Sequence, residues 1–375
     1  MNKFIVALLV VATVVTLVFS GCVGAPAPPV APPVAPPAAP ENPFAGLAIK
    51  PDGTPYYFAY SFVFLTNPWM VFNVGIFENY MKKAGAQYTL HDANLVVEKQ
   101  IADLEDLILK GPDGVIVHPV DGDACVPVVD KLTQAGISVV VNDIEIPTPS
   151  VVALSTADNM QMGRVIGEWL AAYFEEKGIT GHVYECQGTL MQTIAHLRHD
   201  GFLAGIEGTD ITMIGTDCGW ADEPCANAIL AAFPAHPELN AIFTHGGMLK
   251  GASEGLRSLG LLYPVGDPKH ILMVSIDAND QTCALVREGW GDAVVDHCPW
   301  KEMDGCVKAM FHHVILGNPV PKTIVFPGEV LTYEAIVADW ESPVSEIWGN
   351  IMLKEVDLDT LPVLERPEIS TPTLK

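Results

Sequence analysis

Short runs of continuously apolar residues alternate, from about residue 56 to residue 316, with segments whose apolar residues recur at helical spacing. In the segment 99–143 the order is helix, strand, helix, strand, marked by Ile101, Leu104, Leu107 and Ile108, the run Gly114–Val117, then Val126, Val129 and Leu132, and the run Val139–Val141. Neither strand run alternates between apolar and polar residues, which is typical of parallel strands covered by helices on both faces. The pattern predicts an α/β fold with right-handed crossovers.

Polar residues follow both strand runs of this segment. His118 and Asp121 come after the first run, and Asn142 and Asp143 come after the second. Ligands of open parallel sheets bind beyond the carboxyl ends of the strands, so we expect a site on the loops at this edge. A turn is enough to explain His118 and Asp121, which leaves Asp143 as the stronger candidate.

The same alternation fills the rest of the chain. We expect further strands over 56–64, 86–90, 182–186, 211–216, 241–244, 271–276 and 292–295, and further helices over 70–84, 158–173, 193–207, 223–233, 249–259, 280–288 and 301–316. The segment 144–155, which contains Pro147 and Pro149, is expected to be a connection, and 342–375 a polar tail. One α/β pattern used twice predicts two lobes.

The first residues have the features of an export signal. A charged start is followed by apolar or small residues as far as Ser20. The sequence Phe19-Ser20-Gly21-Cys22 resembles the lipobox of bacterial and archaeal surface lipoproteins, in which the cysteine is lipidated and becomes the new N-terminus. Phe19 stands where Leu is usual, so a retained signal anchor stays open. Either outcome places the protein on the outer face of the cytoplasmic membrane.

The segment that follows Cys22 is rich in proline and alanine and predicts a linker over 23–52. This composition favours extended polyproline II structure and cannot build a core. We therefore expect a spacer between a lipid anchor and the folded body.

The charge balance limits the partners. Asp and Glu number 45 against 20 Lys and Arg, a net charge of −25. Such a charge repels a polyphosphate backbone, so we expect no nucleic acid partner.

Seven cysteines follow Cys22, and no two of them have CxxC spacing: Cys125, Cys186, Cys218, Cys225, Cys283, Cys298 and Cys306. The odd number leaves at least one thiol unpaired or paired outside the chain. In an oxidising compartment Cys218 with Cys225, or Cys298 with Cys306, could close a short loop. Cys125 and Cys283 lie within predicted helices and are expected to be small buried side chains.

Catalytic signatures are missing from the sequence. It has no GxSxG elbow, Walker A loop, HExxH pair or GxGxxG after a strand. His312-His313 and His196-x-x-His199 do not have convincing metal-site spacing. We therefore expect a binding protein with no catalytic residue, no cofactor and no metal.

The chain resembles the periplasmic sugar-binding proteins of ABC transporters, specifically the ribose-binding group of type I solute-binding proteins. The landmarks follow in unbroken order between about 55 and 335: Asn67-Pro68-Trp69, Gln100–Asp121, Ala135–Val140, Asp158-Asn159 with Gly163, Gly201-Phe202, His236-Pro237 before Ala241–Phe243, and Ile276-Asp277. The resemblance implies two doubly wound parallel-sheet lobes joined by a three-stranded hinge. Together with the composition of the chain ends, it divides the chain into a signal peptide with lipidated Cys22 (1–22), a linker (23–52), an N-terminal lobe (53–156 and 298–326), a C-terminal lobe (157–297 and 327–341) and a tail (342–375).

Nine residues fall at ligand-binding positions of this family: Asn67, Trp69, Met70, Asp143, His196, Trp220, Gly246, Asp277 and His297. In the family, aromatic rings cover the apolar faces of a sugar, and carboxylates, amides and an arginine bind its hydroxyl groups. The acids could instead cap helices, the tryptophans could pack in a wall, and the histidines could be structural.

This chain departs from the family pattern at four positions. Ile144 and His196 stand where arginines are usual, Gly246 where an asparagine is usual, and His297 where a glutamine is usual. A pocket without guanidinium groups disfavours an anion, so we expect a neutral ligand rich in hydroxyl groups.

The resemblance implies a function in transport. We expect an extracytoplasmic lipoprotein that binds a small sugar, polyol or nucleoside and delivers it to an ABC transporter permease. A sensory receptor of the same fold, or a binder of a nucleoside or another non-sugar molecule, remains an alternative.

Overall fold

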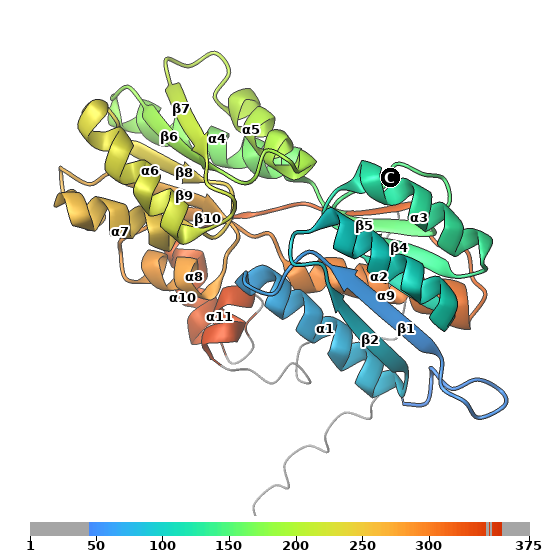
Figure 1. Cartoon of the computed structure of the whole chain (residues 1–375). Helices are drawn as coiled ribbons and strands as arrows, with labels where there is room; N and C mark the ends of the chain where they lie inside the picture. Colours follow the sequence, from blue (N-terminus) through green and yellow to red (C-terminus); the bar gives the residue numbers. More distant parts are fainter. Residues whose placement is uncertain (1–44, 343–344, 346, 355–375) are drawn as a thin grey trace, which may run out of the picture. The chain divides into compact units, whose positions relative to one another are not determined.

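A computed structural model describes residues 45–342, 345 and 347–354 (Figure 1). Two six-stranded sheets, each flanked by helices, form the two lobes. The predicted signal sequence, Cys22, most of the predicted linker and the last part of the predicted tail lie outside the described residues. Within the described ranges, no helix combines the length and the apolar character needed to cross a bilayer.

The sheet of the N-terminal lobe is parallel throughout and has the strand order β11-β5-β4-β3-β1-β2. Its strands are β1 (Tyr57–Phe62), β2 (Gln87–Asp92), β3 (Gly114–Val117), β4 (Ser138–Asn142), β5 (Ala153–Ala157) and β11 (Thr323–Phe326). The helices packed beside it are α1 (Pro68–Ala84), α2 (Val97–Lys110), α3 (Gly122–Gln134) and α9 (Pro299–Met310), which continues into the π-helical turn η1 (Phe311–Ile315).

The sheet of the C-terminal lobe has the order β12-β10-β9-β8-β6-β7 and is parallel except for β12, which runs antiparallel to β10. Its strands are β6 (His182–Gln187), β7 (Thr212–Asp217), β8 (Ala241–Thr244), β9 (Leu272–Ile276), β10 (Ala293–Val295) and β12 (Val330–Thr332). Its helices are α4 (Asn159–Lys177), α5 (Thr193–Gly205), α6 (Asp222–Ala235), α7 (Leu249–Leu259), α8 (Asp280–Arg287), α10 (Tyr333–Glu341) and α11 (Trp348–Leu353).

The apolar runs of the sequence become the central strands. Every residue of β3, β8 and β9 is buried, as expected for strands covered on both faces, whereas the edge strands β2 and β7 are partly exposed. The predicted fold of two α/β lobes is therefore confirmed.

The chain passes from one sheet to the other three times: after β5, after β10, and between β11 and β12. Backbone hydrogen bonds join these passages: the Asp158 N–H donates to the Phe326 carbonyl (2.8 Å), and the Asp296 N–H donates to the Glu329 carbonyl (2.8 Å). The carboxyl ends of the parallel strands lie next to these crossings, which is where Asp143 and His297 occur.

Helices α4 and α5 pack closely because glycines lie on their facing sides. A Cβ on Gly201 of α5 would overlap the Met160 carbonyl oxygen, and a Cβ on Gly167 of α4 would lie 2.7 Å from the Phe202 carbonyl oxygen. Side chains at these positions would force the helices apart. This packing fixes the rotation of α5 and therefore the direction of Arg198, which the site uses.

Two sequence predictions are wrong. The segment 144–155 was expected to be a connection only, but β5 begins within it at Ala153. The expected polar tail includes the short helix α11, in which Trp348 and Ile351 are buried and Gly349 packs on the backbone of Ala278. Helix α11 packs against α8, so its apolar residues are buried by the C-terminal lobe.

The described cysteines are all free thiols, so neither of the two possible disulfide loops is closed. Cys125 in α3 and Cys283 in α8 are fully buried, as their helical positions predicted.

Candidate ligand-binding site

A cavity of about 50 Å³ lies among loops at the carboxyl ends of strands from both sheets. The N-terminal lobe contributes Val63, Phe64, Asn67, Trp69, Met70, His118 and Asp143, and the C-terminal lobe contributes Gln192, Ile194, Arg198, Trp220, Asp277 and His297. Seven of the nine predicted site residues are therefore brought together, and His196 and Gly246 are not in this lining.

Three cavity residues have an uncommon backbone conformation. Asp143 (φ 64°), Trp220 (φ 62°) and Asp277 (φ 72°) are three of the five non-glycine residues with positive φ in the described part of the chain. A left-handed conformation costs a residue with a Cβ about 1–3 kcal/mol and is concentrated at functional sites. Strain at the two acids and at one tryptophan therefore supports a binding role for this cavity.

Asn67 fixes the place of the first tryptophan. Its Oδ1 accepts a hydrogen bond from the Trp69 N–H (2.7 Å) and so caps α1, whose first residue is Pro68. The cap places Trp69 in the first turn, where its ring stacks on the His297 imidazole (5.0 Å between centroids, 23° between planes). Asn67 thus acts as a helix cap and also lines the cavity.

Several buried polar atoms of this wall have no hydrogen-bond partner among the described residues. They are Asp143 Oδ1, His118 Nδ1 and Trp69 Nε1. The other ring nitrogen of His118 lies 3.5 Å from Asp143 Oδ2, and burial lowers the pKa of His118, so this imidazole is neutral at pH 7. Unpaired buried polar atoms are costly, and a ligand with hydroxyl groups could pair with all three.

His297 forms a charged bridge between the lobes. Its Nδ1 donates to Asp277 Oδ1 (2.7 Å), its Nε2 donates to Glu302 Oε1 (2.8 Å) at the start of α9, and the same Nε2 lies 3.9 Å from Asp143 Oδ1. Burial lowers the pKa of His297, but the charges of Glu302 and Asp277 outweigh burial and raise this pKa to about 10. The imidazole is therefore a cation at neutral pH, and both of its nitrogens are donors. Arg198 Nη2 also lies 3.0 Å from His297 Nδ1, and because both of these atoms carry hydrogen, Asp277 rather than His297 accepts at this point.

The pKa values of the two acids in this bridge, Glu302 and Asp277, are shifted in opposite directions. Burial and the charge of Asp143 raise the pKa of Glu302 to about 7. Burial also acts to raise the pKa of Asp277, but the neighbouring His297 and Arg198 charges outweigh it and lower this pKa. Asp277 is therefore a carboxylate at pH 7 and can accept hydrogen bonds.

Arg198 of α5 supplies a guanidinium that sequence reasoning missed. It is 1 % exposed, its Nε donates to Asn159 Oδ1 (2.8 Å), and its Nη1 donates to the His245 carbonyl. Nη1 also lies 3.7 Å from Asp277 Oδ1, and the guanidinium carbon lies 5.4 Å from the centre of the Trp220 ring. The expectation of a pocket without guanidinium is wrong, although most donors of this group are used by the protein.

The expected histidine on the same helix does not reach the cavity. His196 is exposed, and its Nε2 pairs with the Leu190 carbonyl (2.9 Å). Two residues along a helix correspond to a rotation of about 200°, so His196 and Arg198 lie on opposite faces. The available signal was the inward face of α5, on which Ile194, Arg198 and Gly201 recur at helical spacing.

Gly246 lies behind the cavity wall. A Cβ at this position would be 3.0 Å from Trp220 Cε3 and 3.3 Å from Asp277 Oδ2. The absence of a side chain therefore leaves room for the Trp220 ring, whose Nε1 also donates a hydrogen bond to Gln192 Oε1 (2.8 Å).

A larger cleft of about 680 Å³ adjoins the cavity and shares Asp143, Gln192 and Ile194 with it. Its other walls include Asp121, Glu145, Thr156 and the exposed Met191. Asp143 is the only one of its lining residues with a buried side-chain atom that lacks a partner in the described structure. The small cavity is therefore the better candidate for ligand recognition.

Asp143, His297 and Glu302 also lie close enough together to be considered as a metal site, since their nearest ligand atoms are within 4.8 Å of one another. Both nitrogens of His297 lie at hydrogen-bond distance from carboxylates of Asp277 and Glu302, so ion pairing accounts for the close approach of these side chains. The charged bridge explains this cluster without a metal.

Comparison with known proteins places the chain in a family. Residues 58–318, more than half of the chain, match the family of the periplasmic binding protein domain. The protein belongs to this family. The match covers most of both lobes and the whole set of cavity residues.

Individual relatives agree with this assignment. The ribose import binding protein RbsB of Bacillus subtilis is 28% identical over 267 residues, which is 70% of this chain and 83% of the relative. The galactofuranose-binding protein YtfQ of Escherichia coli is 26% identical over 241 residues, 62% of this chain and 74% of the relative. The arabinose-transporter binding protein of Shewanella sp. ANA-3, solved with L-arabinofuranose, is 25% identical, with a TM-score of 0.69 over 76% of this chain and 94% of that one.

The cavity of this periplasmic binding protein domain can therefore offer a ligand three kinds of contact. Carboxylates at Asp143 and Asp277 can accept hydroxyl protons, Trp69 and Trp220 present ring surface, and His118 offers an unpaired nitrogen. Members of the family are solute-binding proteins, and these contacts are of the kind that hold a solute.

Proposed function

We propose that the protein is an extracytoplasmic solute-binding protein that captures a neutral sugar or polyol and delivers it to an ABC transporter permease. The observation that carries this proposal is the convergence of Asp143 and Trp69 from one lobe with Asp277 and Trp220 from the other on one cavity. Relatives named for ribose and galactofuranose binding support a sugar as the ligand class.

The charges of the cavity favour a neutral ligand. Both cations among the described lining residues, Arg198 and His297, lie against Asp277, and His297 also pairs with Glu302. Asp143 has no cation in contact at hydrogen-bond distance. The nearest cation to Asp143 is His297, 3.9 Å away and already paired with Asp277 and Glu302, so a carboxylated or phosphorylated ligand would be repelled by this acid, whereas a sugar hydroxyl can donate to it.

Ligand capture requires movement. The cavity of about 50 Å³ is well below the roughly 300–1,000 Å³ of typical small-molecule pockets. We infer that the lobes separate at the three crossings to admit the sugar, and that contacts to acids and rings of both lobes then favour the closed state. The Asp277–His297–Glu302 bridge spans the lobes and stabilises closure even before the ligand is bound.

We also infer that the protein is anchored through lipidated Cys22, with residues 23–52 as a spacer. The support is the sequence alone, since Cys22 lies outside the described residues. An anchor on the outer face of the membrane would keep the binding protein near its permease.

A thermal-shift screen of the purified protein tests the proposal. The panel contains neutral pentoses, hexoses and inositols, their carboxylated and phosphorylated analogues, and nucleosides, and each compound is recovered afterwards to check for turnover. We expect saturable stabilisation by a neutral sugar or polyol, recovered unchanged. Stabilisation only by an anionic analogue, or turnover of the bound sugar, would contradict the proposal.

A further inference from the structure

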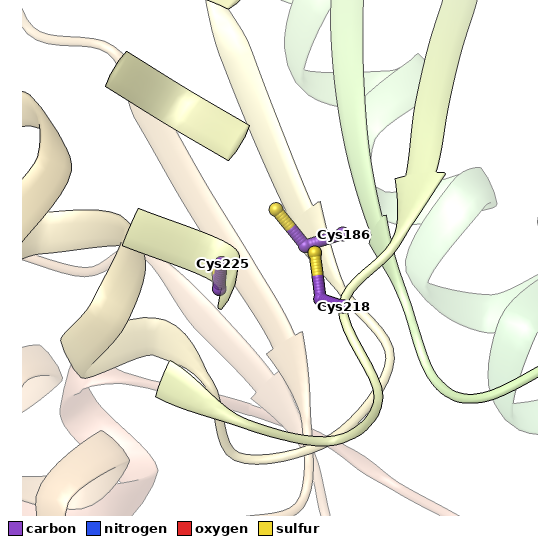
Figure 2. A group of neighbouring side chains, drawn as sticks. All are labelled: Cys186, Cys218 and Cys225. Carbon is purple, nitrogen blue, oxygen red and sulfur yellow. The ribbon is translucent and has the colours of Figure 1, made fainter. Parts of the chain in front are cut away.

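Three cysteines from separate elements converge in the core of the C-terminal lobe. Cys186 lies in β6, Cys218 directly follows β7, and Cys225 lies in the first turn of α6 (Figure 2). Their sulfur atoms are within 4.8 Å of one another, and all three residues are buried. We refer to them as the three-cysteine cluster.

The backbone holds the cluster in place. Cys186 pairs with Thr216 across the parallel β6–β7 ladder, and the Cys218 N–H donates to the Gln187 carbonyl (2.9 Å) just beyond it. A turn then leads to α6, because the Ala221 N–H donates to the Cys218 carbonyl (3.1 Å) and the Cys225 N–H to the Ala221 carbonyl (3.2 Å). The position of each sulfur is therefore set by regular structure on either side.

The thiols have no strong partner other than one another. Cys218 Sγ contacts the Thr216 carbonyl oxygen at 3.6 Å and Cys225 Sγ contacts the Met248 carbonyl oxygen at 3.7 Å, both long contacts for a weak donor. Cys186 belongs to the same apolar core as Tyr184 and Ile229. In the described structure, the three-cysteine cluster therefore offers three sulfur atoms in apolar surroundings.

We propose that the three-cysteine cluster binds one soft monovalent metal ion, Cu(I), through its three sulfur atoms. Three thiolate ligands select a soft ion. Sulfur atoms bound at about 2.3 Å around one ion lie about 4 Å apart in a trigonal arrangement, which the observed upper limit of 4.8 Å accommodates.

The number of ligands distinguishes Cu(I) from zinc. Structural zinc is almost always bound by four ligands. Among the described residues, no fourth His, Cys, Asp or Glu lies together with these three cysteines, and all three cysteines are buried. Cu(I) accepts three-coordinate sulfur sites, so the ligand count and the burial favour it.

The proposal is independent of the sugar-binding function, although the two sites adjoin. Cys218 is two residues before Trp220 in the loop that forms one wall of the cavity. A bound ion would cross-link β6, this loop and α6, and it would protect the three thiols from oxidation outside the cytoplasm.

Competition with a chromophoric Cu(I) chelator, bicinchoninate, tests the site in the reduced full chain under anaerobic conditions. We expect one Cu(I) per chain to be withdrawn from the chelator. Cys186→Ala, Cys218→Ala and Cys225→Ala should each weaken binding at least tenfold. Cys283→Ala is the matched control, since Cys283 is equally buried in the same lobe but outside the cluster, and it should leave binding unchanged.

Several results would overturn the proposal. They are no uptake by the wild type, equal uptake by the cluster variants, preference for Zn(II), or a native disulfide between two of the three cysteines found by peptide mass mapping. X-ray absorption of the copper-loaded wild type does not depend on the folding of any variant. We expect three sulfur ligands, and a spectrum dominated by nitrogen or oxygen ligands would contradict the assignment.

Discussion

Replacing Asp143 with asparagine should weaken sugar binding by about ten- to a hundredfold without unfolding the protein. Asp143 Oδ1 is buried and has no hydrogen-bond partner among the described residues, so it is the acceptor most available to a ligand hydroxyl. A hydrogen bond to a charged group contributes about 1.5–3 kcal/mol, and each 1.4 kcal/mol changes the dissociation constant tenfold. Asparagine keeps the size of the side chain but loses the charge and one acceptor.

The fold should survive this change because the backbone of Asp143 does not depend on its carboxylate. The Asp143 N–H donates to the Ser155 carbonyl (2.8 Å), and its carbonyl accepts from Thr156 Oγ1 (2.6 Å). Asparagine also tolerates the positive φ of 64° at this position. Thermal unfolding of Asp143→Asn without ligand should therefore stay close to that of the wild type.

Isothermal titration calorimetry with the sugar found by the screen gives the affinities. Asp121→Asn is the matched control, because Asp121 caps α3, where asparagine caps equally well, and lines only the larger cleft. Unchanged affinity of folded Asp143→Asn would refute the assigned acceptor. Loss of affinity in Asp121→Asn but not in Asp143→Asn would place the sugar in the larger cleft.

Three further predictions concern the hinge bridge, the helix packing and the anchor. The pKa of His297 is raised from 6.5 to about 10, so its charge contributes stability that is full below about pH 6.5 and is lost as the pH rises towards 10. The free energy of unfolding should therefore fall between pH 7 and 10 in the wild type and fall less in His297→Gln; equal slopes would argue against a charged bridge. Gly201→Ala should lower the free energy of unfolding by about 1–3 kcal/mol in denaturant titrations, because its Cβ would overlap the Met160 carbonyl, and an unchanged midpoint would contradict the close packing of α4 and α5. Cys22→Ala should yield unlipidated precursor or block processing, and an uncleaved Met1 terminus in the mass spectrum of wild-type protein from its own cells would contradict the anchor.

The fold was predictable where one kind of hydrophobic pattern dominates. The continuous apolar runs at Gly114–Val117 and Ala241–Thr244 became β3 and β8 with the expected bounds. Ala153–Ala157 was missed because its residues, ALSTA, are small and partly polar, and their alternating burial comes from pairing with β4 and β11 rather than from an apolar run. Helix α11 was missed because six residues are too few to show helical periodicity.

Site residues at the ends of strands could be predicted from the sequence. Site residues whose direction depends on the rotation of a helix could not. Asp143 and Asp277 come directly after apolar strands, so their edge of the sheet followed from the sequence. Arg198 was missed because the direction of its side chain depends on where α5 begins and on how the glycines of α5 pack against α4. The resemblance to the family pointed to His196 instead and gave no information on the rotation of this helix. Glu302 was missed because it reaches His297 only after the chain returns to the N-terminal lobe.

A crystal structure of the protein with the sugar identified by the thermal-shift screen would show whether both lobes contact the ligand through these residues. We expect one sugar in the cavity between the lobes, with hydroxyl groups at hydrogen-bond distance from Asp143 and Asp277 and with its C–H faces against Trp69 and Trp220. A sugar bound in the larger cleft, or one that contacts a single lobe without either acid, would contradict this expectation.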